Sequence, residues 1–180
     1  MSLALLRDAL AAESPHVSAF LVLGDPDPGR SVELALAAVA AGSTMLELGL
    51  PFDDPCADGP AIQQASERAR AAGVSTDRAL ELLTEIRRGC PATPLNLLVY
   101  GNLVHARGYA RFCSDAVEAG ASSLLVPDIP LEEGASLAKA CAGSGLGLVH
   151  LVAPTTEPDR IADLDAAATA FLYVTAYQGV

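Results

Sequence analysis

Residues 46–60 read LELGLPFDDPCADGP, a stretch in which one carboxylate lies inside an apolar run and another ends a turn-rich segment. The first carboxylate belongs to Glu47, which has a leucine on either side. A charged carboxylate buried among leucines is strongly unfavourable unless it is paired with a cation or takes up a proton through a raised pKa. A protonated carboxyl near neutral pH is the state that a general acid needs. The stretch therefore predicts a buried strand with a functional acid, followed by a loop that ends at Asp58.

Apolar, strand-like runs recur along the whole chain, and each is followed by turn residues. An Ala-rich helical pattern then follows each of the first five runs. This alternation predicts a parallel sheet with helical crossovers, whose strands are buried on both faces. The repeat of roughly 25 to 30 residues fits a (β/α)₈ barrel and a doubly wound sheet equally well. The strand-like runs cover residues 17–23, 44–50, 94–100, 122–127, 146–152 and 170–175.

Local capping chemistry predicts where several helices begin and end. Ser31 is expected to cap a helix that Gly42 ends, because serine accepts hydrogen bonds from free helix N–H groups and glycine suits helix C-termini. By the same signals, an extra helix is expected to begin at Ser75 or Thr76 and to run to Arg88.

Composition and charge exclude several classes of protein. The 180 residues are 51% apolar and 18% charged, which excludes general disorder and suits one domain with a sizeable core. A net charge of -11 repels nucleic acid and anionic membranes, so neither is an expected partner. No apolar run reaches the roughly 18 residues of a membrane span, and the N-terminus lacks a secretory signal pattern, so we expect a cytoplasmic protein. The four cysteines are widely spaced and predict reduced thiols, not a metal or disulfide framework.

The stretch from Leu46 to Gln63 closely resembles the signature of the tryptophan synthase α chain, the indole-3-glycerol-phosphate lyase family. Three further segments match the turns that this family carries after its first, third and fourth strands: LGDP at 23–26, YGN at 100–102 and PDIP at 127–130. The resemblance implies a (β/α)₈ TIM barrel of the tryptophan synthase α type and so favours the barrel over the doubly wound sheet.

A complete barrel takes about 250 residues and eight strands. We therefore expect residues 1–180 to form a single (β/α) barrel domain of about six βα units, C-terminally incomplete relative to eight units, with a short helix over 3–12 before the first strand. In the family, the remaining units carry most of the phosphate-binding glycines and serine. Part of the substrate site is thus expected to be missing from this chain.

Side chains alternate along a strand, so Glu47 and Gly49 face one side and the flanking leucines the other. Because a leucine face must meet the helices, Glu47 is expected to point into the barrel near its C-terminal mouth, where barrel enzymes keep their chemistry. In the family, Glu47 corresponds to the acid/base residue and Asp58 to the carboxylate that accepts the indole N–H. The alternatives are a structural glutamate held by a basic partner, and an aspartate that forms the turn before Gly59-Pro60.

The resemblance also implies a set of substrate-binding residues, for most of which a plain core role is equally consistent. Phosphate would be bound by helix N-termini and backbone N–H groups, which agrees with the absence of basic residues from the strand-like runs. The expected substrate-binding residues are Phe20, Leu98, Tyr100, Leu125, Leu151 and Tyr173, with Gly179 at the start of the sixth loop.

The implied activity is cleavage of indole-3-glycerol phosphate to indole and glyceraldehyde 3-phosphate by retro-aldol acid/base chemistry, the α reaction of tryptophan biosynthesis. It needs no metal and no cofactor, since pyridoxal phosphate belongs to the tryptophan synthase β chain, the expected partner in an α2β2 heterotetramer. Asp53 stands where the family usually has serine, which raises the local negative charge of a loop that meets the β chain. Two other functions stay open: a free-standing indole-producing lyase of specialised metabolism, and a non-catalytic barrel fragment without the phosphate site.

Overall fold

The computed structural model describes residues 2–11 and 15–176 and contains one six-stranded parallel sheet. Every strand lies within the range expected from the sequence. The strands are β1 (Ser18–Val22), β2 (Met45–Gly49), β3 (Leu95–Leu98), β4 (Ser123–Leu125), β5 (Gly147–Val152) and β6 (Leu172–Val174).

The order of the strands decides between the two architectures that the sequence pattern allows. Each strand pairs in parallel with the next one along the chain, from β1 through to β6. A doubly wound sheet reverses its strand order at a switch point, which places helices on both faces. An unbroken chain order with right-handed crossovers places the helices on one face, as in a barrel. The sheet is therefore a six-strand segment of (β/α)₈ barrel wall, as the family resemblance implied.

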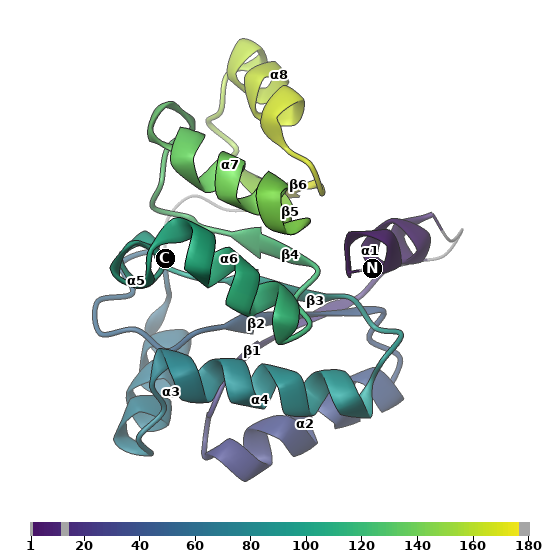
Figure 1. Ribbon diagram of the computed structural model, residues 1–180, viewed down its shortest axis with the longest axis vertical. Helices are drawn as coiled ribbons and strands as arrows, with labels where there is room; N and C mark the ends of the chain where they lie inside the picture. Colours follow the sequence, from purple (N-terminus) through teal and green to yellow (C-terminus); the bar gives the residue numbers. More distant parts are fainter. Residues whose placement is uncertain (1, 12–14, 177–180) are drawn as a thin grey trace.

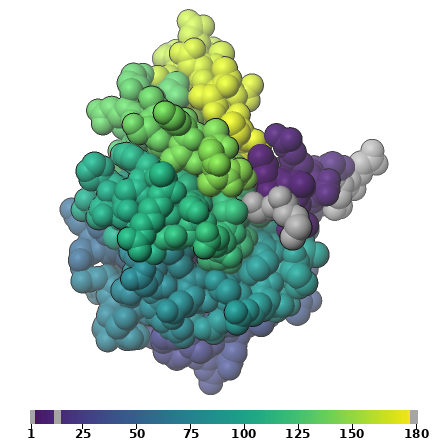
Figure 2. Space-filling view, viewed as in Figure 1, coloured from purple at the N-terminus to yellow at the C-terminus, as the bar shows by residue number. Residues whose placement is uncertain are grey.

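The helices follow one another along the outer side of this wall. Figure 1 shows α2, α4, α6, α7 and α8 in that order beside the strands, with α1 separate from the row. The space-filling view shows α1 beside the fifth βα unit (Figure 2), where Leu3 packs against Gly147 at the start of β5. The helices are α1 (Ser2–Leu10), α2 (Pro28–Ala40), α3 (Pro60–Ala71), α4 (Thr76–Gly89), α5 (Gly101–Arg107), α6 (Tyr109–Glu118), the 3₁₀ turn η1 (Leu131–Glu133), α7 (Ala135–Ser144) and α8 (Pro158–Ala167).

The two faces of the strands differ in composition because alternate side chains point to opposite sides. The outward leucines pack against the helices in one continuous core, in which Leu46, Leu48 and Leu97 are fully buried. On the inner face, the register aligns Phe20 of β1 with Glu47 of β2. Glu47 therefore faces the barrel interior, as expected from the alternation of the sequence.

Helix α2 begins before the residue that the sequence indicated. Asp27 is the N-cap, and its Oδ1 accepts a hydrogen bond from the Arg30 N–H at 3.0 Å, with Pro28 as the first helical residue. The expected cap, Ser31, is instead 3% exposed and accepts the Gly24 N–H at 2.9 Å. The prediction for Ser31 was wrong because this hydroxyl fixes the loop after β1, while the Asp-Pro pair provides a stronger start signal.

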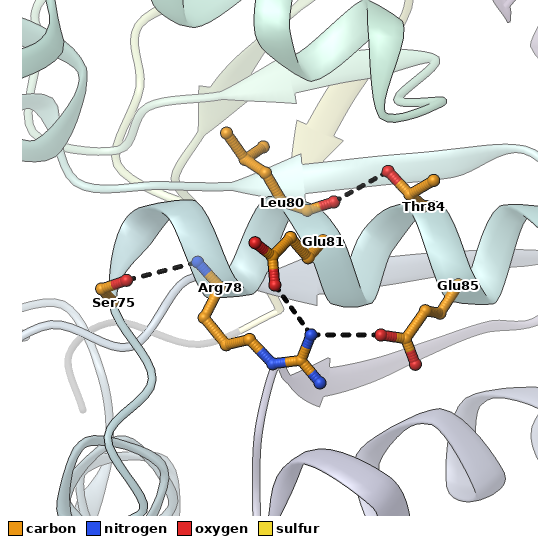
Figure 3. Close-up of polar contacts among 6 residues, drawn as sticks. All are labelled: Ser75, Arg78, Leu80, Glu81, Thr84 and Glu85. Carbon is orange, nitrogen blue, oxygen red and sulfur yellow. Dashed lines mark hydrogen bonds and ion pairs between the residues drawn. The ribbon is translucent and has the colours of Figure 1, made fainter.

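Helix α4 begins where the sequence predicted and shows how the outer helices are stabilised (Figure 3). Ser75 is its N-cap and accepts the Arg78 N–H at 3.2 Å. The Arg78 guanidinium donates to Glu81 at 2.8 Å and to Glu85 at 3.2 Å on the exposed side of the helix. Exposed pairs of this kind stabilise a helix only weakly. The packing of α4 therefore depends mainly on its opposite, apolar face.

The cysteines are free thiols in the structure, in agreement with the sequence. Cys113 of α6 and Cys141 of α7 are both buried, with their sulfur atoms 3.8 Å apart, and they pack these helices together as small apolar groups. Within residues 2–11 and 15–176, no helix is long and apolar enough to cross a bilayer.

Candidate active site

Glu47 lies in the middle of β2 and is almost wholly removed from solvent. Its exposed fraction is 7%, and no hydrogen bond or ion pair joins its carboxyl group to another described residue. Burial without a cationic partner disfavours the charged form of a carboxylate. This desolvation raises the pKa of Glu47 from 4.5 to about 7. The side chain can thus give and take a proton near neutral pH.

The segment after β2 folds back over the end of the strands and carries Asp58. Two tight turns shape it: the Cys56 N–H donates to the Asp54 carbonyl at 2.9 Å, and the Asp58 N–H to the Pro55 carbonyl at 3.0 Å. The carbonyl of Asp58 accepts from the Gln63 side chain of α3 at 2.8 Å. Burial raises the pKa of the Asp58 carboxyl, and a hydrogen bond from the Tyr100 hydroxyl acts in the opposite direction.

A cavity of about 220 Å³ opens on the inner face of the sheet between these two carboxylates. Its remaining walls are mainly apolar, so a small apolar group fits between the two carboxylates. The residues that line it are Phe20, Glu47, Ala57, Asp58, Ile62, Leu98, Pro127, Leu151, Tyr173 and Thr175. Six of the residues expected from the sequence therefore meet in one place.

Two of the expected substrate-binding residues do not line this cavity. Leu125 is 2% exposed and pairs in register with the cavity-lining Leu98, but it is not itself among the lining residues. Tyr100 is also 2% exposed, because the ring of Phe52 covers it at a centroid distance of 5.1 Å. Gly179 lies outside the described residues.

Tyr173 of β6 faces the same interior as Glu47. Burial raises the pKa of its phenol, and the negative charge of ionised Glu47 raises it further. A neutral phenol beside a carboxyl group can donate one hydrogen bond and accept another. Tyr173 is thus placed to act on Glu47 or on a ligand between them.

Four residues that line the cavity were not predicted from the sequence, and only some of them had a sequence feature that could have indicated their position. Ala57 immediately precedes Asp58 and Ile62 follows it by four positions in the signature segment, so their proximity follows from the segment itself. Pro127 begins the PDIP turn, which the sequence singled out only as a turn. Thr175 follows Tyr173 by two positions, and so its side chain points to the same, inner side of the sheet.

The rim of the cavity carries ion pairs that partly compensate the acidic loop. Asp53 forms an ion pair with Arg70 of α3, so the extra carboxylate noted in the sequence has a cation beside it. Arg68, also on α3, donates to Asp25 in the loop after β1 at 2.7 Å. Helix α3 therefore ties two neighbouring loops of the rim together, although these exposed pairs are each weak.

Groups typical of other chemistries lie elsewhere. Throughout residues 2–11 and 15–176, no cluster of three or more His, Cys, Asp or Glu side chains is arranged to hold a metal ion. His150 points to the outer side of β5, where it lines a separate cavity with Thr156 and Arg160. Glu47 and Asp58 are the two carboxylates among the described residues that line the inner cavity.

A protein-family model described as the tryptophan synthase alpha chain matches residues 6–180. The chain belongs to this family. A tryptophan synthase alpha chain from Synechococcus sp. (strain CC9902) is 45% identical over 161 residues, which are 89% of this chain and 60% of that relative. One from Laribacter hongkongensis (strain HLHK9) is also 45% identical, with 61% of its length covered. The chain thus spans about 60% of the length of the curated tryptophan synthase alpha chains it matches.

Solved structures of the tryptophan synthase alpha family agree with this fold. The alpha subunit from Legionella pneumophila str. Paris superposes with a TM-score of 0.89 at 35% identity, over 96% of this chain and 66% of that one. A chain of Mycobacterium tuberculosis tryptophan synthase gives a TM-score of 0.90 at 29% identity, over 98% of this chain and 68% of that one. The alpha-chain names of these relatives give no support to the two alternative functions left open by the sequence.

The buried carboxyl of Glu47 predicts a stability that depends on pH. The native state binds this proton more tightly than the unfolded chain, since the pKa rises from 4.5 to about 7 on folding. Stability from this group is therefore fully present below pH 4.5 and is lost as pH rises through about 7. Glu47→Gln should abolish this loss and make the protein more stable than wild type by up to about 3 kcal/mol at about pH 8.

Urea unfolding of wild type and Glu47→Gln at about pH 5 and about pH 8 measures this difference. Glu118→Gln, a change at an exposed glutamate of α6, is the matched control. It should change the free energy of unfolding by the same amount at both pH values. An equal stability difference between wild type and Glu47→Gln at the two pH values would mean that Glu47 titrates as a solvated carboxyl.

Proposed function

We propose that the complete protein cleaves indole-3-glycerol phosphate to indole and glyceraldehyde 3-phosphate. The observation that carries the proposal is that Glu47 and Asp58 face one small apolar cavity, with the pKa of each carboxyl raised by burial. An indole ring fits apolar walls. Glu47 can act on carbon C3 of that ring, and Asp58 on its N–H group. Family membership supports the same reaction.

Glu47 acts in this proposal as general acid and general base. Its carboxyl delivers a proton to indole C3, which allows the bond between C3 and the glycerol carbon to break. A base then removes the hydroxyl proton as the aldehyde forms, so the electron pair of the broken bond stays with the indole. A carboxyl with a pKa of about 7 is populated in both protonation states near neutral pH and suits both steps.

Asp58 accepts the indole N–H and stabilises the positive charge that develops on the ring when C3 is protonated. A carboxylate placed at a site of developing charge in a water-poor cavity lowers the transition state more than the ground state. The apolar side chains of Phe20, Leu98 and Leu151 provide the surfaces against which the ring stacks. The chain itself needs no cofactor in this scheme, and the phosphate is bound by backbone N–H groups.

The test is an assay of the complete polypeptide with purified indole-3-glycerol phosphate. Indole and glyceraldehyde 3-phosphate should appear in equal amounts, the first by absorbance after extraction and the second through a coupled dehydrogenase. A complete, folded protein that releases neither product, alone or with a tryptophan synthase β chain, would exclude the proposed reaction.

We further propose that the partner is a tryptophan synthase β chain, which carries pyridoxal phosphate. Asp54 and Asn102 are exposed near the rim of the cavity, and Pro55 lies between Asp54 and the turn that leads to Asp58. The family resemblance assigns these three positions to the contact with the β chain. A single change such as Asn102→Ala should weaken the association by roughly tenfold, as is common for a central interface residue.

Titration calorimetry of the complete protein against a β chain measures this effect. Asp163→Asn, at an exposed position on α8, is the control and should leave the affinity unchanged. Equal affinities for Asn102→Ala and wild type would place the contact elsewhere on the surface.

A further inference from the structure

Tyr100 occupies a rigid position at the junction of β3 and α5. It follows Val99, whose N–H donates to the Leu125 carbonyl of β4 at 3.0 Å, and it precedes Gly101, whose N–H donates to the Asp128 side chain at 2.8 Å. The backbone of Tyr100 is therefore fixed on both sides by the neighbouring βα unit. Its side chain is 2% exposed.

The ring of Tyr100 supports the start of the loop that follows β2. Phe52 stacks on it with a centroid distance of 5.1 Å and an interplanar angle of 23°. Stacked aromatic pairs favour one relative orientation and stabilise it beyond the area that they bury. This contact joins residues 48 positions apart in the sequence, and so it ties the loop to a strand of the wall.

The hydroxyl of Tyr100 holds the other end of the same loop. It accepts the Ala57 N–H at 3.0 Å, one residue before Asp58. A phenol that accepts one hydrogen bond still has its own proton to donate. The same hydroxyl lies close enough to the Asp58 carboxyl to favour its ionised form, and it so opposes the effect of burial on the pKa of this group. One buried side chain thus contacts the loop at its beginning, at its end and at its functional carboxylate.

We propose that Tyr100 is a positioning residue that fixes Asp58 at the mouth of the cavity, through its stack on Phe52 and its hydrogen bond to the backbone of Ala57 next to Asp58. The proposal rests on the proposed function in one respect, that Asp58 is the carboxylate that meets the indole N–H. Tyr100 does not touch the cavity itself, so its effect on a ligand passes through the loop.

The arrangement has a physical reason. A functional carboxylate on a loop must be held within about half an ångström of its productive position, and loops supported only by exposed contacts do not achieve this. The exposed Asp53–Arg70 ion pair is such a weak contact. A buried tyrosine on a strand end transfers the rigidity of the barrel wall to Asp58.

Tyr100→Phe in the complete protein tests the proposal, because it removes the hydroxyl and keeps the ring that stacks on Phe52. Two readouts need no substrate. Amide hydrogen exchange at Ala57 should become roughly 2- to 10-fold faster, as expected for the loss of one hydrogen bond. The pKa of Asp58, followed by carbon-13 NMR of its side chain, should rise, because the ionised form loses a donor.

The kinetic readout links the loop to the reaction. In Tyr100→Phe, kcat/KM for indole-3-glycerol phosphate should fall by roughly tenfold, because one hydrogen bond that orients Asp58 is lost while the carboxylate remains. Tyr109→Phe removes a phenol hydroxyl from α6, away from this loop, and should change none of the three readouts. Phe52→Leu keeps the apolar contact and loses the stack, so it should speed exchange at Ala57 without altering the hydrogen bond chemistry of Asp58.

Unchanged exchange at Ala57 and an unchanged pKa of Asp58 in Tyr100→Phe would overturn the proposal, whatever the activity. If Tyr100→Phe does not fold, Phe52→Leu decides by the same exchange measurement. A protein that shows the expected NMR changes but cleaves no indole-3-glycerol phosphate would leave the positioning role in place and would refute only the proposed function.

Discussion

Replacement of Glu47 by glutamine is expected to reduce indole formation by roughly 100- to 10,000-fold in the complete protein, the usual contribution of general acid–base catalysis. Glutamine preserves the volume and polarity of the side chain but has no proton that can be transferred at neutral pH. The fold should survive, because the glutamine avoids the burial of a charge that raises the pKa of Glu47 to about 7. Steady-state kinetics with indole-3-glycerol phosphate, together with circular dichroism, measures both effects.

The pH profile separates this role from a purely structural one. If Glu47 transfers the proton, wild-type kcat should change near pH 7, where this carboxyl titrates. Glu47→Gln should keep its small residual rate and lose that inflection. Glu118→Gln should leave both rate and profile as in wild type. Retention of more than about a tenth of wild-type turnover in Glu47→Gln would exclude Glu47 as the acid.

The barrel wall was largely predictable from the sequence because its strands form apolar runs and its glycines and prolines mark the turns. Burial on both faces holds for the central strands β2 and β4, whereas the edge strands β1 and β6 are partly exposed. All six strands lie within their expected ranges. Their order in the sheet was not predictable from the βα period, since both parallel architectures share that period. The family resemblance made the choice, and the observed pairing of each strand with the next agrees with it.

The predictions for side chains were less complete, because contacts between distant segments leave little trace in a sequence. The alternation of side chains along β2 was enough to place Glu47 inside the barrel. Tyr100 ends an apolar run at a position where the resemblance implies a cavity-lining tyrosine, and nothing near it in sequence indicates that Phe52 covers its ring. Leu125 has inward parity and pairs in register with Leu98 of β3, yet only Leu98 lines the cavity. How far a cavity extends across the sheet depends on the packing of distant segments, which the sequence does not give.

Asp58→Asn is the second change for which we expect a large effect, a fall in kcat of roughly 100-fold. Asparagine has nearly the same shape, and its side-chain oxygen can still accept the indole N–H. It has no negative charge, however, and the positive charge on the protonated indole is what most needs stabilisation in the transition state. KM should change less than kcat, because the neutral indole of the ground state gains little from the charge.

Asp58 is well placed for such an effect because its carboxyl is half-buried beside apolar walls, where a charge is screened less than in water. The neighbouring Tyr100 hydroxyl lowers the pKa of this carboxyl against the effect of burial, and so favours the ionised form that the reaction needs. Asp163→Asn on α8 removes an exposed charge and should leave kcat unchanged. If Asp58→Asn raised KM alone and left kcat at its wild-type value, Asp58 would bind the ring equally in the ground and transition states. Its role would then be recognition of the N–H group, and Glu47 alone would account for the catalysis.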